Sequence, residues 1–278
     1  MGLAHRPLKA STMIPTMART ALIRGTGDVG SAVAIRLFGE GYRVVVHDVP
    51  QPTATRRKMA FADAVFDGAA TLDGVGARRA VNLIEIGELL ARRTVVVYVG
   101  PFAPLAEALA PYVLVDARMR KRAVPESQRG LARVTIGLGP NFHAGVTCDA
   151  AVETSWDGLG TVIYDGATRP LAGEPRELGG HARARYVYAP ADGVFRTQAK
   201  IGDPVTAGQP VAMIDGVVLS APVSGVLRGL THDGVPVTSR TKVIEVDPRG
   251  HAAEVAGIGQ RPRQIADGVM AALRTLGQ

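Results

Sequence analysis

Residues 20–48 read TALIRGTGDVGSAVAIRLFGEGYRVVVHD, and this stretch sets the architecture that we expect. A short apolar run at 21–23 meets a glycine-rich turn, residues 31–38 have helical spacing, and 42–47 is apolar and β-branched. A strand, a helix and a second strand within about 30 residues are typical of a parallel sheet covered by helices. We therefore predict an α/β fold whose first part is a Rossmann-like parallel sheet domain.

The alternation continues downstream of this unit. Residues 94–99, 112–115 and 134–136 are short apolar runs typical of buried strands, and 103–110 has the Ala and Leu spacing of a helix. In such sheets, ligands bind beyond the carboxyl ends of the strands. Candidate site residues are therefore expected in the loops that follow the predicted strands.

A glycine-rich turn follows the first predicted strand. Gly25, Gly27 and Gly30 have the Gly-x-Gly-x-x-Gly spacing, which makes a tight turn, admits a phosphate and brings helix and strand together. Asp48 ends the second strand, 18 residues after Gly30, and could bind ribose hydroxyls. We predict that these four residues bind a nucleotide or related cofactor; a turn that binds another ligand or none is the alternative. Asp28, inside the turn, disfavours a classical NAD site because a carboxylate repels phosphate.

Two aspartates at predicted strand ends are the candidates for catalysis. Asp28 and Asp116 lie at one edge of the expected sheet, where they could hold a metal or handle a proton. A helix cap for Asp28 and a loop closure for Asp116 are the alternatives. Asp28 also belongs to the residues expected to contact the cofactor. No metal site is predicted, because His143 and Cys148 have no partner ligands nearby in the sequence.

Residues in two further loops complete the predicted site. We expect Arg56 and Arg57 to bind the phosphate of a pterin cofactor or nucleotide, together with amides of the glycine-rich turn. Gly137 and Gly139 follow the strand at 134–136 and would let a ligand approach the backbone. Surface arginines at a helix start and a plain crossover turn are the respective alternatives.

The net charge of +7 is concentrated in two segments. Residues 1–19 carry three basic side chains and no acid, and residues 117–133 carry an excess of five positive charges. The second segment contains no aromatic residue, which speaks against nucleic-acid binding and for a small anionic ligand. The apolar runs are far shorter than the roughly 20 residues of a membrane span, so no membrane association is expected. The single cysteine favours a reducing, cytoplasmic location.

An internal repeat occupies the second half of the chain. Residues 189–215 align with 221–247 at a constant offset of 32, with 11 identities in 27 positions. Short repeated strands punctuated by Pro and Gly predict an all-β barrel-sandwich hybrid domain, similar to biotinyl and lipoyl carrier domains. The junction at 213–220 has no lysine, so no covalent biotin or lipoate is expected. A rigid cap, a ligand-contacting wall or an oligomerisation module is expected instead, and a homo-oligomer is left open.

These observations divide the chain into five segments. We predict a mobile leader without a secretory signal at 1–19, the Rossmann-like cofactor domain at 20–150, a connecting segment at 151–185, the repeat domain at 186–250 and a helical segment at 251–278.

Several short motifs follow one another along the chain. They are IRGTGD at 23–28, HDVPQPTATRR at 47–57, AFADAVFDG at 60–68, DA at 116–117 with KR at 121–122, IGLGP at 136–140, ELGG at 177–180, APADG at 189–193 and DPRG at 247–250. This ordered set of motifs resembles the selenium-dependent molybdenum hydroxylase accessory family (YqeB type). The resemblance extends over residues 20–275. It implies a maturation factor for molybdenum hydroxylases such as xanthine dehydrogenases.

Such a factor would bind or modify the molybdenum cofactor (molybdopterin) or a nucleotide and would have an apo molybdenum hydroxylase as its partner. When the residues are considered without the resemblance, two other function classes remain possible. The glycine-rich turn and Asp48 favour an NAD(P)-dependent oxidoreductase, although no proton donor can be named for it. The repeat without its lysine favours a non-enzymatic binding or scaffold module.

Overall fold

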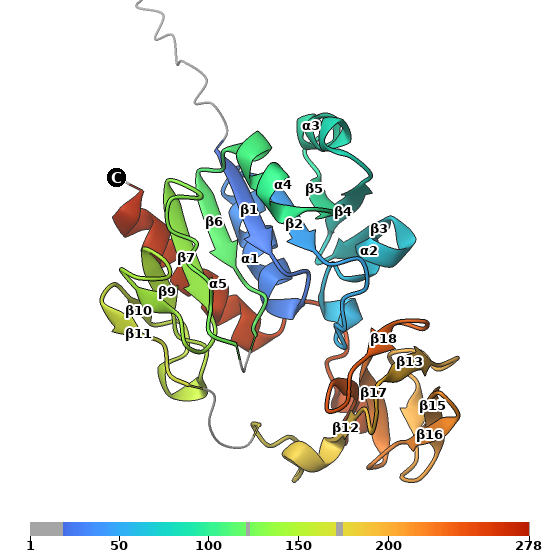
Figure 1. Ribbon diagram of the computed structural model, residues 1–278. Coiled ribbons are helices and arrows are strands. Elements are labelled where there is room, and N and C mark those ends of the chain that lie inside the picture. Colours follow the sequence, from blue (N-terminus) through green and yellow to red (C-terminus); the bar gives the residue numbers. More distant parts are fainter. Residues whose placement is uncertain (1–18, 121–122, 171–174, 278) are drawn as a thin grey trace, which may run out of the picture.

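Figure 1 shows the computed structural model of the chain, which describes residues 19–120, 123–170 and 175–277. The predicted leader, apart from Arg19, lies outside the described residues, and so do Lys121 and Arg122 of the basic segment. The described residues form one large sheet covered by helices, with a smaller unit of strands at its side.

The large sheet contains nine strands. They are β1 (Thr20–Arg24), β2 (Arg43–Asp48), β3 (Ala69–Leu72), β4 (Val75–Ala80), β5 (Val95–Val99), β6 (Val113–Asp116), β7 (Val134–Leu138), β9 (Ala150–Val152) and β10 (Val162–Ile163). Their order is β10-β9-β7-β6-β1-β2-β5-β4-β3. All strands from β9 to β4 in this order run parallel, whereas the edge strands β10 and β3 pair antiparallel with their neighbours. A separate two-stranded ribbon joins β8 (His143–Ala144) and β11 (Gly166–Ala167).

Helices cover both faces of the large sheet. They are α1 (Asp28–Gly39), α2 (Asp63–Asp67), α3 (Leu83–Ala91), α4 (Phe102–Leu109) and α5 (Gln260–Leu276), with short 3-10 turns η1 (Arg57–Met59), η2 (Trp156–Gly158), η3 (Arg183–Arg185) and η4 (Gly250–Ala252). Successive side chains of a strand point to opposite faces, so Ala21 and Ile23 share a core with α1, α2 and α5, whereas Leu22 packs with α3 and α4. None of the described helices is long and apolar enough to cross a membrane.

The smaller unit, called the β unit below, spans residues 186–247 and contains two four-stranded antiparallel sheets. Its strands are β12 (Tyr186–Tyr188), β13 (Gly193–Arg196), β14 (Pro204–Val205), β15 (Pro210–Ile214), β16 (Val217–Ser220), β17 (Gly225–Leu230), β18 (Pro236–Val237) and β19 (Lys242–Asp247). One sheet has the order β12-β19-β17-β14 and the other β16-β15-β13-β18. Strands β13, β14 and β15 each begin 32 residues before β17, β18 and β19, which is the offset of the sequence repeat.

The predicted fold class is wrong. The first part is a mixed sheet with a large parallel core and not a Rossmann-like parallel sheet, because antiparallel strands extend it at both edges. At one edge, Asp73 and Gly74 have φ values of 46° and 79°, which make the tight turn of the β3–β4 hairpin.

The second part of the prediction is corrected as well. The β unit is not a barrel-sandwich hybrid of the biotinyl or lipoyl kind, because β12 comes from outside the repeat and completes one of the two sheets. The β unit is also not the last part of the chain, because α5 comes after it and packs on the large sheet. Ile265, Val269 and Leu273 of α5 share a buried core with Val33 and Leu37 of α1, so the chain returns to the large sheet after the β unit (Figure 1).

Candidate functional site

The glycine-rich turn between β1 and α1 packs against the loop that follows β6. Gly25 has a φ of +108°, and a Cβ there would lie 2.9 Å from the Ala117 carbonyl oxygen. A Cβ at Gly30 would lie 2.0 Å from the Gly25 carbonyl oxygen, whereas a Cβ at Gly27 would meet nothing within 4 Å. The first and third glycines therefore serve the close approach of chain segments, and Ala117 fills the space beside the turn.

The Asp48 carboxylate is bonded to the same turn. Its Oδ2 accepts hydrogen bonds from the Thr26 backbone N–H at 2.6 Å and from the Thr26 hydroxyl at 2.5 Å. Its Oδ1 accepts a further bond from the Val49 N–H at 2.8 Å. The carboxylate predicted to bind ribose is thus engaged in holding the turn beside β2.

Gly137 and Gly139, at the end of β7, are also explained by packing within the chain. A Cβ at Gly137 would lie 2.1 Å from the ring of Phe142, so the glycine makes room for that ring. Gly139 has a φ of +107° and lies beside Met119, whose sulfur would be 3.3 Å from a Cβ. Of the other predicted site residues, Asp116 is the neighbour of Gly137, because the two pair in the parallel register of β6 and β7.

Asp116, at the end of β6, is buried and paired with arginines. The Arg118 guanidinium contacts both of its carboxylate oxygens, and Nη1 of Arg24 lies 3.9 Å from Oδ2. Arg24 and Arg118 also pair with Glu126, as does Arg120, and Arg129 pairs with Asp149, so three arginines of the basic segment have carboxylate partners within the chain. Asp28 and Asp116 share no partner, and the described ranges contain no group of three or more His, Cys, Asp or Glu side chains placed to hold a metal ion.

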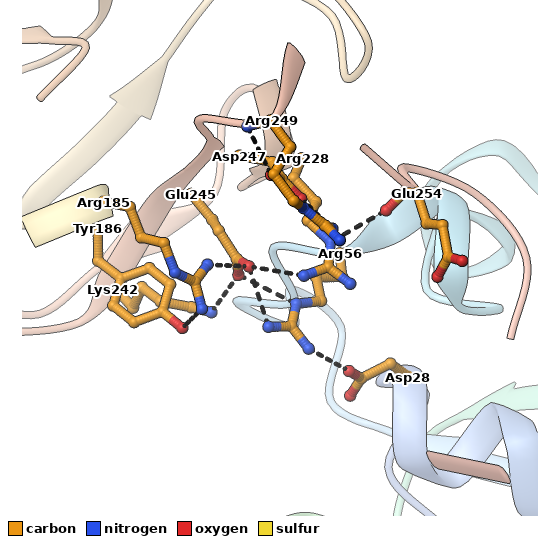
Figure 2. Close-up of polar contacts among 10 residues, drawn as sticks. All are labelled: Asp28, Arg56, Arg185, Tyr186, Arg228, Lys242, Glu245, Asp247, Arg249 and Glu254. Carbon is orange, nitrogen blue, oxygen red and sulfur yellow. Dashed lines mark hydrogen bonds and ion pairs between the residues drawn. The ribbon is translucent and has the colours of Figure 1, made fainter. Parts of the chain in front are cut away.

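Asp28, the first residue of α1, faces the contact region between the large sheet and the β unit (Figure 2). Its Oδ1 accepts a hydrogen bond from the Val29 N–H at 3.0 Å, and its Oδ2 lies 3.1 Å from Nη1 of Arg56. Arg56 in turn contacts both carboxylate oxygens of Glu245 on β19, each at 3.0 Å. The Arg56 guanidinium therefore joins the Asp28 carboxylate, at the start of α1, to the Glu245 carboxylate of the β unit.

Glu245 is fully buried and is surrounded by cations. Besides Arg56, its carboxylate contacts Arg185 at 2.6 Å, Lys242 at 2.9 Å and Arg228 at 3.5 Å (Figure 2). We call the following residues the junction cluster: Asp28, Arg56, Arg185, Arg228, Lys242 and Glu245. The junction cluster has four cations for two carboxylates, so it carries an excess of positive charge.

The cations of the junction cluster shift the pKa values of both carboxylates. Burial raises the pKa of Glu245, but Lys242, Arg56 and Arg185 outweigh burial and hold this pKa well below its usual range. Burial also raises the pKa of Asp28, and Arg56 outweighs it, so the net shift is downward. Asp28 is therefore ionised at neutral pH and is a poor proton donor, which disfavours the predicted catalytic role.

Arg57 lies outside the junction cluster and fastens the β unit to the large sheet. Its Nε donates a hydrogen bond to the Leu230 carbonyl oxygen at 2.9 Å, and its Nη1 lies 2.5 Å from Oδ1 of Asp63. The adjacent Lys58 donates to the Ile201 carbonyl oxygen at 2.5 Å. The two arginines that we expected to act together thus have different surroundings.

Of the predicted site residues, Asp28 and Arg56 contact each other within the junction cluster. Sequence reasoning missed the four other members, which are Arg185, Arg228, Lys242 and Glu245. One signal was present, because Glu245 stands among apolar residues of a strand and aligns with Met213 at the repeat offset. A carboxylate in an otherwise buried strand indicates a paired charge.

The low pKa of Glu245 predicts a loss of stability in acid. A carboxyl group whose pKa is lower in the folded state than in the unfolded chain stabilises the fold above its unfolded pKa, about 4.3 for Glu. We expect little change in the free energy of unfolding between pH 7 and about 5, and a progressive fall as the pH drops below about 4.3. Urea unfolding at a series of pH values measures this, and a Glu245→Gln variant should show a shallower dependence. Equal slopes for both proteins would contradict the assignment.

The comparison with solved structures finds only weak likeness. No protein-family model matches the chain. The solved structures that it resembles include the ectoine utilization protein EutE (DoeB) of Ruegeria pomeroyi, with 14% sequence identity and a TM-score of 0.24 over 82% of this chain and 85% of that one. An aspartoacylase family protein of Mesorhizobium loti has 10% identity and a TM-score of 0.27 over 82% of this chain and 85% of that one. A succinylglutamate desuccinylase of Silicibacter sp. has 13% identity and a TM-score of 0.25 over 82% of this chain and 84% of that one. TM-scores this low carry no information on the site or its activity.

The comparison with curated protein sequences finds a clear relative. The chain is 39% identical over 265 residues to the uncharacterized protein YqeB of Escherichia coli (strain K12), and the match covers 94% of this chain. The chain spans about half of that relative, because the match covers 48% of its length. The likeness to YqeB is thereby confirmed over most of this chain, while the selenium-dependent hydroxylase role stays a prediction.

Proposed function

We propose that the protein binds a small anionic cofactor at the junction cluster and acts as an accessory factor in the maturation of molybdenum hydroxylases. The observation that supports binding is the excess of cations around Glu245. The neighbouring Asp247 does not remove this excess, because its carboxylate is paired with Arg249 at 2.7 Å. The accessory role rests on the family resemblance of the sequence motifs.

Two further features support an anion at the junction cluster. Burial lowers the pKa of Arg228, and the nearby charge of Arg56 lowers it further, as expected where positive charge is not fully compensated. Arg185 is 2% exposed, and its Nε has no hydrogen-bond partner among the described residues. A buried donor without a partner is costly and is satisfied by an added acceptor.

A phosphate-bearing cofactor fits the junction cluster better than it fits the glycine-rich turn. Ala117 closes the space beside Gly25, and the Asp28 carboxylate already accepts an amide at the start of α1. Arg56 and Lys242 are partly exposed and would hold the phosphate of molybdopterin or of a nucleotide, in competition with Asp28. The molybdenum cofactor, when bound, would supply metal-centred chemistry to the hydroxylase that receives it.

We do not propose a nicotinamide-dependent reaction. The carboxylate expected on the ribose, Asp48, is bonded to Thr26 and Val49. A non-enzymatic binding module is compatible with the junction cluster, and the proposal differs from it only in the delivery of a cofactor to an apo-hydroxylase.

Asp28 and a bound anion would compete for Arg56, so removing the Asp28 charge should raise the affinity for the anion. Asp28→Asn removes a negative charge beside Arg56, so we expect affinity for pyrophosphate, AMP or molybdopterin to rise about tenfold, equivalent to about 1.4 kcal/mol. Arg56→Ala should lower affinity by at least as much. Isothermal titration calorimetry measures both, with Arg36→Ala on the exposed side of α1 as the matched control.

Unchanged affinity in both the Asp28→Asn and Arg56→Ala variants would show that the junction cluster is only structural. The accessory role has its own readout, which is the activity of an apo molybdenum hydroxylase after incubation with the protein and molybdopterin. We expect reconstitution to follow the order of affinities in these variants. Tight binding without any reconstitution would favour the non-enzymatic binding module.

A further inference from the structure

A pocket lies beside the N-terminal end of α5, and none of the site residues predicted from the sequence lines it. It has a volume of about 660 Å³. Five of its lining side chains carry the argument: Trp156, Asp157, Arg176, Gln260 and Gln264. None of them belongs to the junction cluster, so the inference below does not depend on the proposed function.

The loop that forms one wall of the pocket is fixed to α5. Arg261 donates two hydrogen bonds to the Thr154 carbonyl oxygen, at 3.1 and 2.7 Å. Gly160 has a φ of +81°, and a Cβ there would lie 2.7 Å from the Gln264 carbonyl oxygen. A Cβ at Gly268 would in turn lie 2.5 Å from the Gly160 carbonyl oxygen. This close packing positions η2, and with it Trp156, against the helix.

The ring of Trp156 offers a stacking surface. The side chain is 42% exposed, although a large aromatic residue is usually mostly buried. The planar guanidinium of Arg176 lies over the ring, with its carbon 4.6 Å from the ring centroid. The indole face thus already accepts a flat, hydrogen-bonding group.

The pocket lining also carries polar groups that can bond to the edge of a flat ligand ring stacked on Trp156. Gln260 and Gln264 are four residues apart on α5, so both project from one face of the helix. Each carboxamide has two N–H donors and an oxygen acceptor, which allows paired bonds to a heterocycle. Asp157 adds an acceptor for ring or exocyclic N–H groups and lies 3.7 Å from Arg169.

We infer that this pocket binds the heterocycle of a purine- or pterin-class ligand. The ring stacks on Trp156 in place of the Arg176 guanidinium, and its polar edge bonds to Gln260 and Gln264. A purely apolar ligand would make no use of the two carboxamides, and a simple anion would make no use of the indole face.

The test uses the fact that Trp156 is the only tryptophan of the chain. Titration of the full-length protein with guanosine, adenosine or pterin should quench its fluorescence in a saturable way, and calorimetry should give the same affinity. The double variant Gln260→Ala, Gln264→Ala should bind at least tenfold more weakly, whereas Gln51→Ala, an exposed glutamine outside the pocket, should bind as the wild type does.

Arg176→Ala gives an opposite expectation. Because Arg176 occupies the indole face, its removal should leave the affinity unchanged or raise it severalfold. All four glutamine and arginine positions are exposed, so thermal melting should confirm that each variant folds. Absence of saturable quenching by all three compounds, or equal affinity in the wild type and the double glutamine variant, would overturn the inference.

Discussion

Replacing Glu245 with alanine is expected to destabilise the protein by about 3–5 kcal/mol, the cost of removing one partner of a buried charge network. The side chain is fully buried, and four cations contact its carboxylate. Without Glu245 these cations repel one another, and two of them, Arg185 and Arg228, are themselves shielded from water. Urea unfolding followed by circular dichroism measures the loss at pH 7.

The matched control is Glu40→Ala, at the residue that follows α1. Glu40 also pairs with an arginine, Arg36, at 2.5 Å, but both side chains are more than 40% exposed. An exposed pair of this kind contributes about 0.5 kcal/mol or less, so the control should change the unfolding midpoint little. Similar losses for the two variants would mean that burial of the Glu245 network does not determine its contribution.

Much of the sheet was predictable, because a buried parallel strand has a local signature. The apolar runs at 21–23, 42–47 and 94–99 coincide with β1, β2 and β5, since consecutive β-branched residues are rarely compatible with any other buried element. The edge strands were missed for the same physical reason. Strand β3 alternates exposed residues with one half-buried and one buried residue, and β10 is two residues long, so neither forms an apolar run.

The site was less predictable, because its residues meet only through long-range contacts. Arg56 and Glu245 are 189 positions apart, and no local pattern pairs them. The glycine spacing does not by itself tell which contact each glycine serves, since a glycine required by another chain segment looks the same in the sequence as one required by a phosphate. The two cases separate only when the neighbours of each glycine are known.

Gly30→Ala and Gly27→Ala test whether each glycine is required by a neighbouring chain segment or by a bound phosphate. A Cβ at position 30 would lie 2.0 Å from the Gly25 carbonyl oxygen, a backbone atom that cannot move without shifting the turn. We expect a loss of at least about 3 kcal/mol for Gly30→Ala. Gly27 has a φ of −65° and nothing within 4 Å of an added Cβ, so Gly27→Ala should change stability by less than about 1 kcal/mol.

Ligand affinity of the Gly27→Ala variant distinguishes binding at the glycine-rich turn from binding at the junction cluster. If the turn held a phosphate, Gly27 would be the position where the ligand approaches the backbone, and alanine there would abolish binding while leaving the fold intact. If the anion binds at the junction cluster, Gly27→Ala should bind pyrophosphate and AMP as the wild type does. Calorimetric titration of Gly27→Ala therefore tells which of the two regions holds the ligand, because this substitution should abolish binding only at the turn, whereas Arg56→Ala should weaken binding in either case.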